Sequence, residues 1–136
     1  MSKALVKKII KSTNGIGFLA TIDGATPRVR PMAVSVSKDG MLLTSTFTRS
    51  PKMKQIAKNS RIELCFCDEG MQQVRISGRM KVVKDAKKKA SFFKKSPDLK
   101  RYFKSVDDPN YTLLEMKPAK VMLMKAGEMK YSKIKW

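Results

Sequence analysis

Hydrophobic and polar positions along the chain follow two different periods. Between residues 3 and 11 the apolar side chains recur at helical spacing, and lysines mostly occupy the opposite side. The apolar positions are Leu5, Val6, Ile9 and Ile10. From residue 16 onward the apolar residues instead form short, β-branched runs bounded by turn-forming Gly, Pro and Asp. The pattern predicts one short amphipathic helix followed by a meander of antiparallel strands.

The strand-like runs extend over most of the chain. They span residues 16–22, 28–37, 41–47, 61–67, 72–83, 111–116 and 119–125. Pro118 separates the last two runs, because proline cannot donate to a sheet and is confined to edges and irregular positions. The tail 131–136 alternates in the same way, and is either a last short strand or an arm that contacts a partner.

Helices are predicted at residues 51–59, 85–95 and 97–103. In the first of them Ser50 is a typical N-cap, and Pro51 suits the first helical position. Strands of this number and spacing, with helices between them, predict a mostly β fold. We expect an antiparallel β-barrel with peripheral helices over its ends, forming one domain over residues 1–136.

The run 28–37 contains two alternating kinds of side chain. Met32, Val34 and Val36 are apolar, whereas the residues between them are small or polar. Successive side chains of a strand point to opposite faces of its sheet. One face is therefore predicted to be buried, and the other leaves room for a ligand.

The chain contains no histidine. Histidine is the usual general base near neutral pH and the usual axial ligand of haem, so Ser-His-Asp and Cys-His catalysis are excluded. Cys65 and Cys67 lie two residues apart in a strand-like run, which predicts free, buried thiols rather than a disulfide. Two cysteines alone make no metal site.

The charge of the chain is strongly unbalanced. It has 30 Lys and Arg against 11 Asp and Glu, a formal net charge of +19. Such a surface attracts anions, and both a solvated lysine-rich surface and a functional basic patch remain open. No window approaches the roughly 18 apolar residues of a membrane span, and the start lacks the apolar core of a signal peptide. We therefore expect a soluble, cytoplasmic protein that does not bind membranes.

Three basic segments could meet a phosphate group. They are Arg28–Arg30, Ser50–Lys52 and Gln72–Arg75. The second is favoured because a helix N-terminus presents unpaired backbone N–H groups, to which Ser50 adds a hydroxyl and Lys52 a full positive charge. In the alternative interpretation Ser50 only caps its helix and Lys52 is solvated.

Several segments, taken in order, resemble the pyridoxamine 5'-phosphate oxidase-like split-barrel flavoproteins, especially their short general-stress-protein branch. These segments are Gly17–Thr21, Pro27–Met32, Gly40–Ser45, Ser50–Lys52 with Gln55–Ile56, and Gln73–Gly78. The resemblance covers most of the chain and depends on the order and spacing of the segments. It implies an antiparallel split β-barrel that forms a homodimer, with flavin mononucleotide (FMN) held in a groove between the subunits.

The resemblance also implies roles for individual residues. Arg30 and Lys52 would bind the FMN phosphate, since a guanidinium offers bidentate contacts and an ammonium a point charge. Hydroxyls of Ser50, Thr44 and Ser45 would add short hydrogen bonds, and Gln73 would bond the flavin rings or the ribityl chain. The residues expected along the edge of the isoalloxazine ring are Pro31, Met32, Ala33, Val34 and Ser35. The implied activity is that of an FMN-dependent oxidoreductase that takes electrons from NAD(P)H or another donor, with no catalytic side chain assigned.

The sequence departs from the oxidase itself in two respects. Ser35 stands where the oxidase has a lysine, and the oxidase's C-terminal arginine-and-histidine motif cannot exist without histidine. We therefore do not expect oxidation of pyridoxamine phosphate. Nitroimidazole reductases and haem-degrading relatives that depend on histidine are disfavoured for the same reason. A deazaflavin-dependent reductase, which shares the barrel, remains an alternative.

A basic nucleic-acid-binding barrel is the main alternative from another class. Barrels that bind single strands stack bases on exposed aromatic side chains. Phe18, Phe47 and Phe66 occupy strand positions that are predicted to face the core. Specific binding of nucleic acid is therefore not expected.

Overall fold

The computed structural model describes residues 2–136, whose strands form one antiparallel sheet. The strands are β1 (Ile16–Asp23), β2 (Thr26–Ala33), β3 (Ser35–Val36), β4 (Leu42–Phe47), β5 (Arg61–Cys67), β6 (Gln73–Val82), β7 (Tyr111–Met124) and β8 (Ser132–Ile134). The helices are α1 (Lys3–Ser12), α2 (Pro51–Lys58) and α3 (Ala86–Lys95), with a 3-10 helix, η1, at Pro97–Arg101. This mostly β architecture with peripheral helices confirms the fold class predicted from the sequence.

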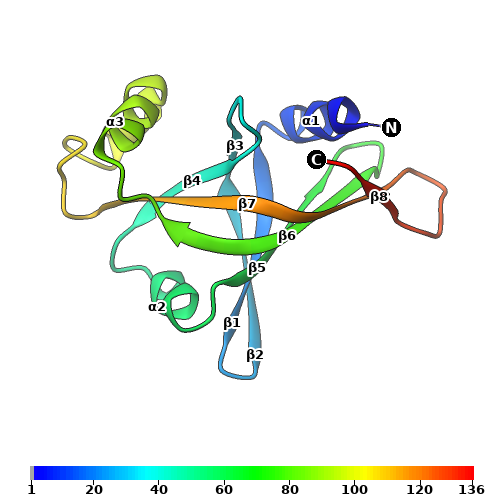
Figure 1. The fold of residues 1–136 in the computed structure, drawn as a ribbon, viewed down its shortest axis with the longest axis horizontal. Helices are drawn as coiled ribbons and strands as arrows, with labels where there is room; N and C mark the ends of the chain where they lie inside the picture. Colours follow the sequence, from blue (N-terminus) through cyan, green and yellow to red (C-terminus); the bar gives the residue numbers. More distant parts are fainter. Residues whose placement is uncertain (1) are drawn as a thin grey trace.

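The sheet is curled in the manner of a split barrel. Its strand order is β2-β1-β5-β6-β7-β4-β3, and β8 pairs with β7. Figure 1 shows β6 and β7 as long strands that extend across the molecule, while the β1–β2 hairpin crosses them. Phe66 and Ile76 belong to the main core, to which α1 contributes Val6, Ile9 and Ile10. Among the described residues no helix is long and apolar enough to cross a membrane.

A second, smaller core lies beneath α3 and η1. Phe93 of α3 packs against Tyr111 of β7 with ring centroids 5.4 Å apart, and Phe103 lies 5.0 Å from the same ring. The helix begins at a regular cap, because the Asp85 carboxylate accepts backbone N–H bonds from the first turn. This packing fixes α3 and η1 over the end of the sheet that β4 and β7 form.

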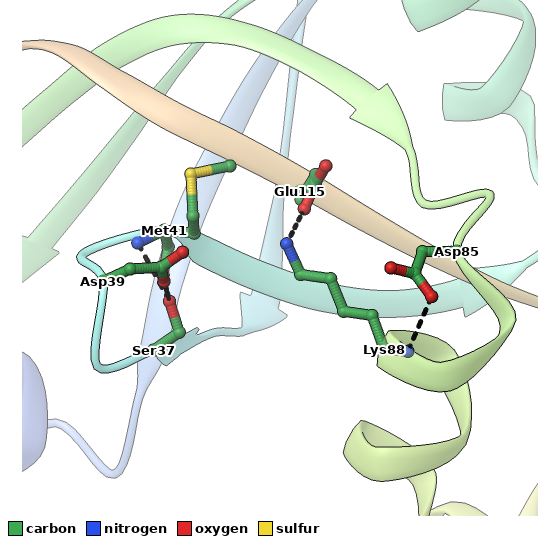
Figure 2. A network of polar contacts seen from close by, with 6 residues as sticks. All are labelled: Ser37, Asp39, Met41, Asp85, Lys88 and Glu115. Carbon is green, nitrogen blue, oxygen red and sulfur yellow. Dashed lines mark hydrogen bonds and ion pairs between the residues drawn. The ribbon is translucent and has the colours of Figure 1, made fainter.

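An ion pair ties α3 to the sheet. Figure 2 shows the ammonium of Lys88 reaching across to the carboxylate of Glu115 on β7. The same view shows the β3–β4 turn, in which the Ser37 hydroxyl contacts the Asp39 carboxylate and accepts the N–H of Met41 at 3.0 Å. Helix, turn and central strand therefore meet on one side of the molecule.

The last long strand differs from the prediction. The sequence predicts two strands on either side of Pro118, but β7 runs without interruption. It pairs with β6 along this length, and the register shifts between Ser77 and Gly78, where Gly78 lies opposite Pro118. A Cβ atom on Gly78 would lie 2.8 Å from the carbonyl oxygen of Lys117. The irregular register at Gly78 means that no ladder hydrogen bond is required from Pro118, which has no N–H. β7 can therefore continue through Pro118.

The predicted strand 28–37 is divided into two. β2 pairs with β1, whereas β3 pairs with β4 on the other edge of the sheet. Val34 lies between them, and its N–H donates to the carbonyl of Gly15 at 2.8 Å. Asn14 and Gly15, with φ of 56° and 75°, turn the chain after α1 so that this bond can form. At Val34, whose N–H bonds to Gly15, the chain therefore leaves its pairing with β1 and begins its pairing with β4.

Two aromatic side chains are placed differently from the prediction. Phe66 is fully buried, but Phe18 and Phe47 are 50% and 47% exposed, so the prediction that these two face the core is wrong. Phe18 lies on the outer face of β1, opposite Cys65 of β5. Cys65 and Cys67 are free, as predicted, but Cys65 is only partly buried and Cys67 is exposed, so the prediction of buried thiols is wrong. The outer face of the sheet is thus more apolar than expected.

The tail forms a strand. β8 pairs antiparallel with β7, with Ile134 opposite Val121. Beyond it, Nε1 of Trp136 donates to the carbonyl of Gly40 at 2.8 Å. Of the two interpretations of the tail, the short strand is the one observed.

Candidate functional site

Arg30 lies on β2, and its guanidinium group contacts β1 and α2. Nη1 donates to the carbonyl of Leu19 at 3.1 Å and to Oγ1 of Thr21 at 2.8 Å. Nη2 donates to Oε1 of Gln55 at 2.9 Å. Thr21 and Gln55 are themselves buried and hydrogen-bonded to each other at 2.5 Å. Two strands and a helix therefore fix the orientation of the guanidinium.

One edge of the Arg30 guanidinium remains available. The group has five N–H donors, and three of them are used in the bonds described above. Thr21 and Gln55 occupy the edge between Nη1 and Nη2, so Nε–H and one Nη2–H have no partner among residues 2–136. These two donors share the other edge of the group. A phosphate or carboxylate accepts such an edge in a bidentate manner.

Lys52, Ser50 and Thr46 form a second polar group beside Arg30. Nζ of Lys52 donates to Oγ1 of Thr46 at 2.7 Å and to Oγ of Ser50 at 3.2 Å. The two hydroxyl oxygens lie 3.3 Å apart. Ser50 is the N-cap of α2, yet its side chain makes no capping hydrogen bond. The interpretation in which Ser50 only caps its helix is therefore wrong.

Arg30 is close enough to Lys52 to affect its pKa. Burial lowers the pKa of Lys52, and the nearby charge of Arg30 lowers it further. Burial also lowers the pKa of Arg30. The ion pairs among residues 2–136 include neither residue. Two neighbouring cations without a carboxylate favour binding of a multivalent anion.

A groove of about 550 Å³ lies beside this cluster. All the residues predicted along the isoalloxazine edge line it: Pro31, Met32, Ala33, Val34 and Ser35. Phe92 and Lys95 of α3 and Tyr102 after η1 also line the groove. Lys52 lines both this groove and a neighbouring depression that includes Arg30. The cationic cluster is thus continuous with a groove whose walls are partly aromatic.

The two predicted hydroxyls of β4 have different surroundings. Ser45 lines the groove, and its buried Oγ has no hydrogen-bond partner among the described residues. Burial raises the pKa of the neighbouring Tyr111 and the Ser45 hydroxyl opposes that rise, yet the two hydroxyls do not reach hydrogen-bond geometry. Thr44 does not line the groove, and its hydroxyl donates to the carbonyl of Ala33 at 2.7 Å. The Tyr111 hydroxyl is buried and unpaired in the same way, so the Ser45 hydroxyl does not by itself indicate a ligand in the groove.

Gln73 lies apart from the other predicted site residues. Its Oε1 accepts a hydrogen bond from the hydroxyl of Tyr131 at 2.7 Å. β6, which begins at Gln73, is three strands away from β2 in the sheet. Gln73 lines neither the groove nor the depression at Arg30. Within one chain the structure does not bring Gln73 to the cluster.

Some residues of the cluster were not predicted as site residues. Thr46 could have been found from strand alternation, because it shares a face with Thr44 and lies nearer to Ser50. Gln55 is buried on α2 beside Ile56, and a glutamine on an apolar helix face is a recognisable signal. Its contact with Arg30 joins two segments 25 residues apart, which no local pattern reveals.

Comparison with known proteins places these features in a family. The family model described as pyridoxamine 5'-phosphate oxidase matches residues 3–125. General stress protein 26 of Bacillus subtilis is 31% identical over 118 residues, which cover 83% of this chain and 81% of that protein. The matched region contains the whole of the Arg30–Lys52 cluster and all residues that line the groove.

Solved structures share the fold. A NimC/NimA family protein of Clostridium acetobutylicum superposes with a TM-score of 0.82 at 22% identity, over 97% of this chain and 90% of that one. A pyridoxamine 5'-phosphate oxidase-related, FMN-binding protein of Nostoc punctiforme superposes with a TM-score of 0.77 at 16% identity, over 96% and 88%. With the family model matched over almost the whole chain, this protein belongs to the pyridoxamine 5'-phosphate oxidase-like family, as the order of its strand and helix segments implied.

Proposed function

We propose that this chain binds FMN in the groove and acts as an FMN-dependent oxidoreductase. The observation that carries the proposal is the pair of cations, Arg30 and Lys52, held without a carboxylate partner among residues 2–136 at a groove. A phosphate monoester carries a charge of about −1.5 to −2 at pH 7. The free edge of Arg30 and the ammonium of Lys52 match that charge, and the hydroxyls of Ser50 and Thr46 complete the donor set.

The remaining residues of the groove bind and shield the rest of the ligand. Pro31–Ser35 provide a strand edge with exposed Ala33 and Ser35, so a flat ring can approach the backbone. Ser45, Phe92 and Tyr102 also line the groove. When bound, FMN supplies the redox chemistry. Oxidation of pyridoxamine phosphate is not part of this proposal, and NAD(P)H or another donor supplies the electrons.

A homodimer is part of the same proposal. The outer face of β1 and β2 exposes an apolar strip, consisting of Ile16, Phe18, Ile22 and Val29 at 43%, 50%, 37% and 68% exposure. Val29 lies opposite Ala20 in the β1–β2 register, so the strip is continuous across both strands. Such a face is typical of an interface. We assign the partner subunit's Gln73 to the groove, since each chain's own Gln73 lies three strands away from β2.

The proposal is tested by titrating the purified protein with FMN, riboflavin and a deazaflavin that carries a phosphate, followed by absorption and fluorescence. FMN is expected to bind much more tightly than riboflavin, because only FMN presents a phosphate to Arg30 and Lys52. Equal affinity for FMN and riboflavin would contradict the role of the cluster. Preferential binding of the deazaflavin would assign the groove to that cofactor instead.

A further inference from the structure

A second cavity, of about 650 Å³, lies between α1 and the β3–β4 turn. Three lysines line it: Lys7 and Lys11 of α1, and Lys38 of the turn. The other polar residues of its lining are Asn14, Ser35 and Ser37. No acidic residue of the described chain lines this cavity. We call it the lysine cavity.

The charges of the lysine cavity are not compensated by the protein. None of the ion pairs among residues 2–136 includes Lys7, Lys11 or Lys38. Lys7 and Lys11 are four residues apart on α1, a spacing at which like charges destabilise a helix. Asp39 follows Lys38 in sequence, but its carboxylate contacts the Ser37 hydroxyl and does not line the cavity. A bound anion would relieve this repulsion.

The lysine cavity adjoins the groove at a defined place. The two share Asn14, Val34 and Ser35, and the last two belong to the segment that we assign to the edge of the flavin ring. Neither Arg30 nor Lys52 lines the lysine cavity. A site there is therefore distinct from the proposed site of the cofactor's own phosphate, and it adjoins the groove. The volume lies within the usual range of small-molecule sites, about 300–1,000 Å³.

We propose that the lysine cavity binds the phosphate of a small, phosphate-bearing co-substrate of this protein. Its role as a co-substrate site rests on the proposed function, whereas the binding of phosphate does not. A nicotinamide dinucleotide, with its pyrophosphate, and a phosphorylated electron acceptor share this chemistry. Three lysines in the lining of one concavity suit a polyanion better than a single carboxylate.

The chain contains its own reporter for this site. Trp136 is the only tryptophan, and its ring centroid lies 4.9 Å from Nζ of Lys3 and 6.0 Å from Nζ of Lys7. An anion that draws the Lys7 ammonium into the cavity changes the surroundings of the indole. Tryptophan fluorescence therefore measures occupancy without reference to flavin.

The test compares the wild type with two triple variants of equal charge. K7Q/K11Q/K38Q removes the lysines of the cavity, and K81Q/K125Q/K130Q removes three exposed lysines elsewhere. Inorganic pyrophosphate, NAD⁺, NADP⁺ and a short oligonucleotide are titrated separately against each protein at fixed ionic strength. Calorimetry accompanies the fluorescence, and FMN is titrated in parallel.

Pyrophosphate is expected to bind the wild type and the control variant with the same affinity within twofold, and the cavity variant at least tenfold more weakly. FMN affinity is expected to stay within twofold in all three proteins. Binding of NAD⁺ or NADP⁺ identifies a dinucleotide as the source of the phosphate, and pyrophosphate binding alone points to another phosphorylated compound.

Equal weakening in both triple variants would overturn the proposal, because it would reduce the effect to net charge. The proposal would also be overturned if K7Q/K11Q/K38Q weakened oligonucleotide binding more than it weakened pyrophosphate binding. A wild type that binds pyrophosphate in this cavity but not FMN would contradict the proposed function and leave the anion site in place.

Discussion

Oε1 of Gln55 accepts a hydrogen bond from Nη2 of Arg30 at 2.9 Å, so a buried neutral amide on α2 orients a cation on β2. The same oxygen accepts the hydroxyl of Thr21 at 2.5 Å. These bonds leave Nε–H and one Nη2–H of Arg30 without a partner among residues 2–136. Gln55 is therefore expected to position Arg30 for the proposed anion binding, and it also lines the depression at Arg30.

Replacing Gln55 with methionine should weaken FMN binding while leaving riboflavin binding unchanged. Gln55→Met keeps the length of the side chain but removes the acceptor, so the free edge of Arg30 is no longer fixed. Loss of one such hydrogen bond is worth about 1 kcal/mol, or about fivefold in Kd. Gln72→Met is the matched control, since among residues 2–136 the hydrogen bonds of the Gln72 side chain go to Asp68. A fall in riboflavin affinity of the same size would show that the variant damages the groove rather than the phosphate site.

Lys52→Ala should weaken FMN binding by about 1.5–3 kcal/mol, the scale of a hydrogen bond to a charged group. Lys54→Ala, two residues further on the same helix and exposed, should have little effect. The FMN affinity of each variant is measured by the quenching of FMN fluorescence on binding. Similar losses in the two variants would indicate that only the general charge of α2 matters.

The affinity of the wild type for FMN should also depend on pH in a way that Lys52 explains. Burial and Arg30 lower the pKa of Lys52 from the ordinary value of 10.5. Since the charged ammonium binds phosphate, affinity is fully present below the lowered pKa and is lost as pH rises through it. Lys52→Arg keeps its charge at alkaline pH and should remove this decline. An unchanged decline in that variant would assign it to another group.

Phe18→Asp should prevent formation of the proposed dimer and abolish FMN binding, because it places a charge in the apolar strip of β1. Light scattering measures the mass, and absorption of the same sample measures bound flavin. Met129→Asp is the control: Met129 is 93% exposed but lies outside the sheet. A monomeric Phe18→Asp protein that still binds FMN with wild-type affinity would refute the proposal that the groove needs both subunits.

Glu115→Gln should lower the free energy of unfolding by about 1–2 kcal/mol, since it leaves Lys88 half-buried without its partner. The two side chains are 13% and 33% exposed. Asp98→Asn is the comparison, because its ion pair with Arg101 is almost fully exposed. Urea denaturation is expected to show a loss below about 0.5 kcal/mol for that variant. Equal losses would mean that the Lys88–Glu115 pair adds no more than a surface contact.

The features that the sequence predicts correctly are those determined by residues close together in the chain. Pro51 marks the start of α2 because a first-turn proline acts within one helical turn, and Ser50 holds the N-cap position although its side chain makes no capping hydrogen bond. Strand alternation likewise places Phe66 in the core. The same alternation does not indicate which face of a strand is covered by the rest of the protein. For this reason the sequence predicts a core position for Phe18, which in the structure lies on the exposed face of β1.

The site required knowledge of the strand order, which the sequence pattern does not contain. Arg30 and Lys52 come together because β2, β1 and α2 meet around Thr21 and Gln55. Gln73 belongs to an equally recognisable segment, yet β6 lies three strands from β2. Residue type and spacing mark the Arg30–Lys52 segments and the Gln73 segment equally well. Only the strand order shows that Gln73 lies away from the other two residues.

The position of β7 in the sheet has a consequence for the chain as it is made. β7 joins β6 to β4, but both of these strands are synthesised earlier. On the ribosome each therefore carries an open edge until residue 124 has emerged, and open edges are templates for pairing between nascent chains. The segment 84–95, between β6 and β7, contains a dense run of lysines. Like charges repel one another, so these lysines are expected to oppose such pairing while the sheet is incomplete.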